Sequence, residues 1–221
     1  MSKENVSLNS EETTAFLQSA DKVREVAARH LNENRGSSLS ITFVRNLQSG
    51  IDQVFSAAVD QGVAVACKLG CNHCCSARVE AIEPEVFRIA REIASRPLDE
   101  LNAHIERLRV YVAMPRDAVP WNRRTPCPFL IADLCSIYAV RPGVCRKAHS
   151  LDVAKCAANA PEIPQHLNIV LGAEALMKGT ADAYREVGLP AAAHDLGPAV
   201  LLALTDPTAE SRWLNGEAVF D

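Results

Sequence analysis

The sequence predicts a mainly α-helical protein, in which a helical frame surrounds an irregular, cysteine-rich segment that metal staples together. Three observations support this prediction. Apolar residues recur at three- and four-residue steps over several long stretches, which is the spacing of one helix face. The chain has no internal repeat, and strands do not alternate with helices. All eight cysteines of the 221 residues lie between Cys67 and Cys156.

The region before the cysteines, residues 1–66, contains two amphipathic stretches. A first helix is predicted from Asn9, a residue that caps helices well, to about His30. Polar residues and a glycine within 34–38 should end it. A second apolar face runs over 41–66, and two glycines inside it weaken the helix without ending it. We therefore expect this second helix to lead directly into the first cysteine.

Between the two groups of cysteines, the pattern predicts two shorter helices. Pro84 suits a first helical turn, and an apolar stripe follows it. Pro97 interrupts that stripe, and a second stripe begins with Leu98. From 115 to 126 the periodicity gives way to a loop with three prolines and Trp121.

The second half of the cysteine region, 127–156, is too irregular for long elements, although 129–131 could form a short strand. Residues 167–187 are again predicted to be helical. A short apolar helix over 197–204 should end at Asp206 and Pro207. We divide the chain into an N-terminal helical region (1–66), a cysteine-cluster region (67–160) and a C-terminal helical region (161–221), expected to form one compact domain.

Composition narrows the classes of function. Hydrophobic residues make up 48% and charged residues 23%, which is ordinary for a globular protein. The net charge of −4 gives no reason to expect a nucleic-acid partner. The charge is uneven, because 121–150 carries a net +4 from five basic residues and one acidic residue: Arg123, Arg124, Arg141, Arg146 and Lys147, with Asp133.

The expected compartment is the cytoplasm. The polar N-terminus lacks the apolar core of a signal peptide, and no apolar run is long enough to span a membrane. Cytoplasmic thiols stay reduced or bind metal, so disulfides are not expected. The adjacent Cys74 and Cys75 could be bridged only with distorted geometry.

The cysteines themselves predict a metal site. Their order is a tight group of four followed by four at wider spacing: Cys67, Cys71, Cys74 and Cys75, then Cys127, Cys135, Cys145 and Cys156. Zinc takes four thiolates in a tetrahedron, and iron–sulfur clusters are also held by thiolates. Eight thiolates therefore match two four-coordinate sites, or one iron–sulfur cluster with thiols to spare. The cofactor is thus zinc or iron.

The spacing within the first group suggests how its thiols divide. The two-residue gap between Cys71 and Cys74 lets both sulfurs face one ion. Cys67 lies one helical turn before Cys71 and can join them if the helix continues. The side chain of Cys75 points away from that of Cys74, so Cys75 should serve a second metal or a polynuclear centre.

Charge is consistent with ligation. Two Zn²⁺ ions with eight thiolates would carry a net charge of −4. The net charge of +4 on residues 121–150 has the sign and size to offset it. Arg141, Arg146 and Lys147 flank Cys145 and are the main candidates, since positive neighbours keep thiols deprotonated. The alternative is that these residues form a solvated basic face.

The motifs that surround these cysteines resemble those of the YkgJ-type cysteine-cluster family, also called the zinc- or iron-chelating domain. The motifs are Cys67-Lys-Leu-Gly-Cys71-Asn-His-Cys74-Cys75, Cys127-Pro-Phe-Leu, Cys135-Ser-Ile-Tyr138 and Arg141-Pro-Gly-Val-Cys145-Arg. The resemblance covers about residues 60–160 and implies an eight-cysteine metal site. The gap between Cys67 and Cys71 is one residue longer than in the family's shorthand, and Cys156 lies at the edge of the match. The resemblance implies no particular reaction.

Other residues offer weaker candidates. His73 and His149 could replace a thiol as ligand, or hydrogen-bond a sulfur. Tyr138 and Trp121 are expected to pack over the metal rather than catalyse. A set of carboxylates after the first cysteines suits a helix start better than acid–base work: Glu80, Glu83 and Glu85. The sequence identifies no catalytic residue, no phosphate-binding glycine loop and no nucleophile elbow.

The leading hypothesis is a metal-binding protein that folds around zinc or iron held by eight thiolates. The alternatives are an iron–sulfur oxidoreductase and a metal-dependent modifying enzyme that acts with a partner. Whether the protein is an enzyme is left open, and the sequence identifies no protein partner.

Overall fold

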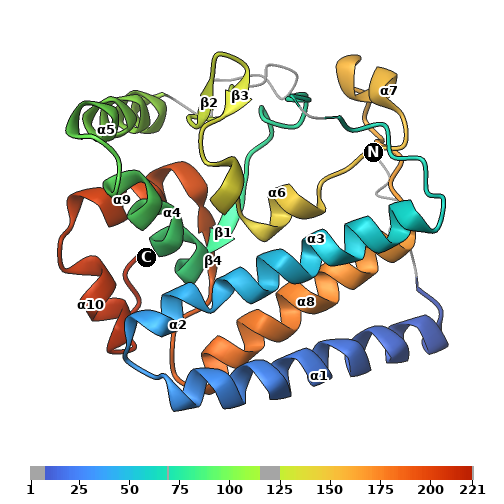
Figure 1. The fold of residues 1–221 in the computed structure, drawn as a ribbon, viewed down its shortest axis with the longest axis horizontal. Helices are drawn as coiled ribbons and strands as arrows, with labels where there is room; N and C mark the ends of the chain where they lie inside the picture. The colour runs from blue at the N-terminus through green and yellow to red at the C-terminus, as the bar shows by residue number, and fades with distance from the viewer. Residues whose placement is uncertain (1–7, 69, 115–124, 221) are drawn as a thin grey trace.

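The computed structural model describes residues 8–68, 70–114 and 125–220. It confirms a mainly α-helical fold (Figure 1). The helices are α1 (Ser10–Glu33), α2 (Ser38–Thr42), α3 (Val44–Asp60), α4 (Glu83–Ala94), α5 (Leu98–Ala113), the 3₁₀ helix η1 (Tyr138–Val140), α6 (Gly143–Lys147), α7 (Val153–Ala157), α8 (Leu167–Glu186), α9 (Leu196–Thr205) and α10 (Ala209–Leu214). The strands are β1 (Glu80–Ile82), β2 (Leu130–Ile131), β3 (Leu134–Cys135) and β4 (Ala193–Asp195).

Helix α1 begins where its capping residues predict. The Asn9 side chain accepts the Glu12 backbone N–H at 2.9 Å, and the Glu12 carboxylate accepts the Asn9 N–H at 2.9 Å. This reciprocal pair satisfies two backbone donors that a helix start otherwise leaves without partners. The helix ends at Asn34, and Gly36 follows with φ +72°.

The prediction that the second helix leads directly into Cys67 is wrong. The stretch forms two helices, α2 and α3, and α3 ends at Asp60. Gly62 adopts φ +94°, a left-handed conformation that ends helices and that glycine takes without steric cost. Residues 63–68 are therefore not helical, and Cys67 does not lie one helical turn before Cys71.

Helices α1, α3 and α8 lie side by side along one side of the molecule (Figure 1). Small residues on α8 allow the neighbouring helices to approach closely. A Cβ at Gly172 would lie 2.9 Å from Val54 Cγ1 of α3, and a Cβ at Gly179 would lie 2.7 Å from Val23 Cβ of α1. The contact between α1 and α8 is therefore too close for any larger side chain at 179.

A second group of helices, α4, α5, α9 and α10, packs around a core of its own and joins the first group through aromatic side chains. Trp213, Tyr184 and Phe87 are fully buried where the two groups meet. Strands β1 and β4 pair antiparallel, with Glu80 opposite Asp195. This short sheet, which the sequence analysis did not predict, connects the first cysteines to α4 and α9.

The second half of the cysteine region consists of short elements. The predicted strand over 129–131 is observed as β2, which pairs with β3 in a hairpin. Ala132 and Asp133 form its turn with φ of 47° and 63°. Most of the predicted loop over 115–126, including Trp121, lies outside the described residues. None of the helices in the described ranges has the length and apolar character needed to cross a bilayer.

Candidate metal centre

The first group of cysteines lies on a series of tight turns between α3 and β1. The Cys71 N–H donates to the Lys68 carbonyl at 2.9 Å, and the Cys75 N–H donates to the Asn72 carbonyl at 2.8 Å. Gly70 has φ +82° within this segment. These turns bring cysteines of neighbouring sequence onto one compact stretch of backbone.

The second group is distributed over one connecting segment and three short elements. Cys127 precedes the β2–β3 hairpin, Cys135 ends it, Cys145 lies in α6 and Cys156 in α7. All eight cysteines are thiols, because none forms a disulfide.

Backbone and side-chain hydrogen bonds tie the two groups together. The Cys127 N–H donates to the Cys75 carbonyl at 2.7 Å, so these two cysteines are adjacent. Asn72 Nδ2 donates to Asp133 Oδ1 at 3.0 Å, which joins the first turn to the hairpin. The Ala66 N–H donates to the Ser150 carbonyl at 2.9 Å, beside Cys67. The structure therefore brings both halves of the cysteine region together.

The thiols of the two groups lie close enough for their charges to interact. Burial is the largest cause that raises the pKa of Cys145, and charge on three other thiols raises it further: Cys127, Cys74 and Cys135. For Cys75, a hydrogen bond with Cys74 is the largest cause that raises the pKa, ahead of burial and of charge on Cys127 and Cys135.

Cys67 lies among a different set of neighbours. Burial is the largest cause that raises its pKa, and charge on Cys71, Cys74 and Cys156 raises it further. Cys74 therefore acts on the pKa of five other thiols: Cys67, Cys75, Cys127, Cys135 and Cys145.

Three of the sulfurs accept a hydrogen bond from the backbone. Burial raises the pKa of Cys67, Cys127 and Cys135, and in each case a backbone N–H partly offsets it. The donors are Ser150 for Cys67, Phe129 for Cys127 and Ile137 for Cys135. Such donors favour the thiolate form, which is the form that binds metal.

The thiols are neighbours without forming a closed coordination shell. Among residues 8–68, 70–114 and 125–220, no three or more Cys, His, Asp or Glu side chains are arranged to hold a metal ion. The donor set nevertheless fits a thiolate-binding metal chemically, because the two segments that carry the cysteines meet and three of the sulfurs accept N–H donors.

The basic residues that flank Cys145 have different environments. The positive charge of Arg141 lowers the pKa of Cys135, although burial raises it more. The Arg141 guanidinium also lies 3.8 Å from the centre of the Tyr138 ring, which is half exposed. Tyr138 thus stacks on an arginine beside the hairpin.

Arg146 and Lys147, in contrast, pair with carboxylates of the helical frame. Arg146 lies 2.5 Å from Asp52 of α3, and Lys147 pairs with Glu174 of α8. These pairs hold α6 against both helices, so Arg141 is the described basic residue whose charge acts most directly on a thiol. Arg123 and Arg124 lie outside the described residues.

His149 is buried, and both of its ring nitrogens are already hydrogen-bonded. Nδ1 faces the Lys147 carbonyl at 2.9 Å and must donate to it, while Nε2 accepts the His166 N–H at 2.8 Å. Metal ligation through either nitrogen would break a backbone hydrogen bond. His149 therefore supports the chain next to Ser150 and Cys67 rather than offering a ligand.

His73 lies at a small cavity beside the thiols. The cavity has a volume of about 290 Å³, and two cysteines, Cys75 and Cys156, line it together with polar and apolar side chains: Asn72, His73, Ser76, Asn159, Pro126, Leu130 and Ala157. It brings cysteines of both groups to one opening.

Glu85 supports the metal site in a way that the sequence did not reveal. As predicted for a helix start, its carboxylate accepts the Ile82 N–H at 3.4 Å. It also accepts the Gly143 N–H at 2.6 Å, at the first residue of the helix that carries Cys145. Glu83, by contrast, is buried and lies 2.9 Å from His194 Nε2. Only the structure reveals these long-range partners.

Glu85 predicts a dependence of stability on pH. Burial raises its pKa from 4.5 to about 7, although the Gly143 and Ile82 N–H groups lower it. Because the folded-state pKa is raised, ionisation of Glu85 costs stability, and the cost grows as pH rises from about 4.5 to about 7. The full cost is about 3 kcal/mol. We expect Glu85→Gln to become more stable relative to the wild type as pH rises over this range.

Urea unfolding of the two proteins at several pH values would measure this difference. Glu80→Gln, at an exposed position of β1, is the control and should show no such trend. A constant difference between Glu85→Gln and the wild type would contradict the prediction.

A second supporting network holds the β2–β3 hairpin. Arg96 Nη2 donates to the Ser136 carbonyl at 2.6 Å, and the Ser136 hydroxyl donates to the Phe129 carbonyl at 2.9 Å. His104, which received no role from sequence, is buried with Nδ1 2.9 Å from the Glu100 carbonyl and Nε2 3.2 Å from Ser136 Oγ. Arg96, which follows α4, and His104 of α5 thus anchor Ser136, the residue next to Cys135.

The fold and the site together define a mainly helical protein that carries a cysteine-cluster domain. Residues 66–163 match the family model CxxCxxCC, described as a putative zinc- or iron-chelating domain. This match agrees with the zinc- or iron-chelating domain that the motifs resemble, and it supports metal binding. Comparisons with curated proteins and with solved structures gave no significant match.

Proposed function

We propose that this protein holds zinc or iron through all eight cysteine thiolates, in two neighbouring sites that share Cys74. Cys74 would bridge the two ions, with Cys67, Cys71 and Cys156 completing the first site and Cys75, Cys127, Cys135 and Cys145 lying around the second. The observation that carries this proposal is that the two groups of cysteines meet within the matched domain, where the Cys127 N–H donates to the Cys75 carbonyl at 2.7 Å. The direction of the thiol pKa shifts agrees with it.

The surrounding residues supply what thiolate ligation needs. Backbone N–H groups of Ser150, Phe129 and Ile137 stabilise negative charge on three sulfurs. Arg141 adds positive charge near Cys135. Zinc in such a site would supply folding energy, whereas an iron–sulfur cluster would also supply redox chemistry.

The cavity next to Cys75 and Cys156 favours a second candidate function. Its volume of about 290 Å³ would give a small molecule access to the thiol site. This access suits an iron–sulfur oxidoreductase or a metal-dependent modifying enzyme better than a closed structural site, which leaves no position for a substrate. The partner of such an enzyme and the cytoplasmic location stay predictions.

Elemental analysis combined with thiol titration tests the proposal. For zinc, we expect two ions per chain, a colourless protein, and thiols that react fully only after chelation. An iron–sulfur protein, purified without oxygen, would be brown. A metal-free preparation with eight freely reactive thiols would contradict both candidates.

Metal removal should also loosen the cysteine region, because binding energy in such sites is folding energy. After chelation, we expect faster amide hydrogen exchange over 67–156, while α1, α3 and α8 stay protected. Unchanged exchange over 67–156 after complete metal loss would show that the metal does not hold this segment together.

A further inference from the structure

Residues of the C-terminal half of α1 and of the C-terminal end of α8 line a groove. These two helix ends lie away from α7 and the β2–β3 hairpin (Figure 1). The groove has a volume of about 830 Å³, within the range of small-molecule sites. Three arginines line it, Arg24, Arg29 and Arg35, against two glutamates, Glu25 and Glu186. The thiol chemistry described above makes no use of this groove.

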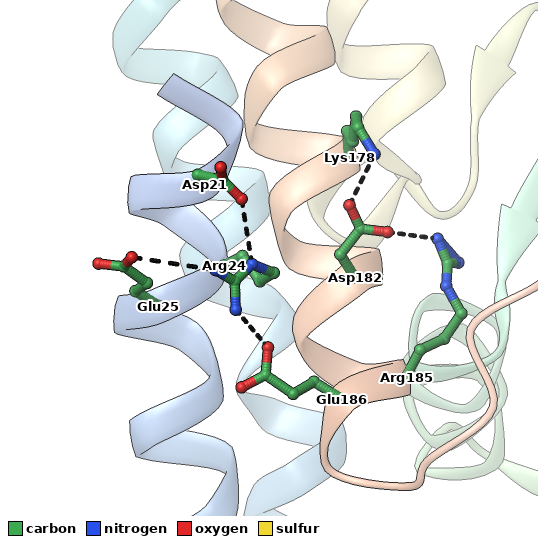
Figure 2. Close-up of polar contacts among 7 residues, drawn as sticks. All are labelled: Asp21, Arg24, Glu25, Lys178, Asp182, Arg185 and Glu186. Carbon is green, nitrogen blue, oxygen red and sulfur yellow. Dashed lines mark hydrogen bonds and ion pairs between the residues drawn. The ribbon is translucent and has the colours of Figure 1, made fainter. Parts of the chain in front are cut away.

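Arg24 is the fixed part of the groove. Its Nη1 lies 2.5 Å from Glu186 of α8, and its Nε lies 3.2 Å from Asp21 of α1 (Figure 2). The hydrogen bond with Glu186 is the largest cause that raises the pKa of Arg24. Its Nη2 also lies 3.9 Å from Glu25 Oε1. Arg24 therefore joins the two helices, and its single positive charge is shared among three carboxylates, including both glutamates of the lining.

The other two arginines are not neutralised in this way. Within the described part of the chain, neither Arg29 nor Arg35 has a carboxylate at ion-pair distance. Arg29 Nε makes a long hydrogen bond to the Glu25 carbonyl, 3.4 Å. Arg35 Nη2 lies over Gly188, where a Cβ would be only 2.8 Å away. Gly188, with φ +77°, thus leaves room for the Arg35 guanidinium at the groove.

These arginines are not needed to cap the helix ends. At the end of α1, Asn34 Nδ2 donates to the His30 carbonyl at 2.8 Å. At the end of α8, the N–H groups of Val187 and Gly188 donate to carbonyls of the last turn at 3.2 and 3.0 Å. The terminal carbonyls that usually attract basic side chains therefore have other donors, and two guanidiniums face the groove with free N–H groups.

We propose that this groove binds a molecule through a phosphate or pyrophosphate group. A guanidinium donates two parallel hydrogen bonds to phosphate oxygens, and Arg29 and Arg35 both line the groove. The Asn32 side chain, also in the lining, adds an amide donor. Asp21, Glu25 and Glu186 hold Arg24 in place, so the positive charge that a phosphate would meet comes from Arg29 and Arg35.

Isothermal titration of the full-length, metal-loaded protein with pyrophosphate at low salt tests this proposal. We expect binding at one site, and at least a tenfold loss of affinity in the double variant Arg29→Ala/Arg35→Ala. Arg109→Ala removes an exposed arginine of α5 that pairs with Glu106, and is the matched control. Its affinity should equal that of the wild type.

A second arm distinguishes the source of the phosphate. Co-sedimentation with phosphatidylcholine vesicles, with and without phosphatidate, would reveal a lipid headgroup as ligand. Phosphatidate-dependent binding that the double variant loses would identify the ligand as lipid. Binding of pyrophosphate alone would identify a free phosphorylated molecule.

Metal content is measured before and after each titration, because pyrophosphate also binds metal ions. Heat from metal extraction would be the same in the wild type and in the double variant. The difference between their titration heats therefore measures binding to Arg29 and Arg35. The proposal is wrong if neither probe binds, or if the double variant and the Arg109 control bind as the wild type does.

Discussion

Cys74→Ser is expected to cost the protein both of its metal ions, whereas Cys75→Ser should cost only one. Cys74 acts on the pKa of Cys67, which we assign to the first site, and of four thiols that we assign to the second, so its loss would open both sites. The pKa of Cys75 responds to Cys74, Cys127 and Cys135, all of which we assign to the second site. Elemental analysis of both purified variants measures the difference.

Cys156→Ser provides the complementary measurement. Cys156 acts on Cys67, so this variant should keep the ion that Cys75→Ser loses. Each lost ion should also lower stability by several kcal/mol, because the thiolates that remain are left without their shared cation. Equal metal loss in Cys74→Ser and Cys75→Ser would contradict the arrangement of two sites around Cys74.

Gly179→Ala should destabilise the fold by about 3 kcal/mol, the upper part of the usual cost of overpacking. An added Cβ would lie 2.7 Å from Val23 Cβ and still closer to the Ala20 carbonyl oxygen. A backbone oxygen cannot rotate away, so α1 and α8 would have to separate. The midpoint and slope of urea unfolding measure the loss.

Gly50→Ala is the matched control for this prediction. Gly50 also lies in a helix that packs against α8, but its nearest neighbour is the flexible end of Leu176, 3.1 Å from the added Cβ. Alanine also favours a helix interior over glycine by up to about 1 kcal/mol. We expect Gly50→Ala to be neutral or slightly stabilising, and similar losses in both variants would argue against a backbone clash at 179.

Local signals allowed much of the helical frame to be predicted. The cap at Asn9, the proline at 84 and the break at Pro97 each involve only a few neighbouring residues. The end of α3 was missed because a glycine in a periodic stretch can continue the helix or adopt positive φ. Gly62 adopts positive φ and ends the helix, an outcome that the sequence pattern does not distinguish from a continuing helix.

In the candidate site, too, local sequence predicted some features, whereas others depend on residues far apart in the chain. Spacing alone predicted that thiols of the first group lie together, since a chain of nine residues keeps them close. The basic residues were harder to interpret, because Arg146 and Lys147 have carboxylate partners on α3 and α8. These partners are far from Arg146 and Lys147 in the sequence, so composition alone grouped both residues with Arg141 as candidates to offset thiolate charge. Among these three residues, it is the charge of Arg141 that lowers the pKa of a thiol.

By itself, the sequence determined that this is a helical protein with eight thiols suited to zinc or iron, because helix periodicity and donor chemistry are local properties. The tertiary structure decided which thiols meet and which groups support them. The bonds from Cys127 to Cys75, from Asn72 to Asp133 and from Gly143 to Glu85 each close a loop of about 50 residues or more. Such closures form only when packing of the whole helical frame offsets their entropy.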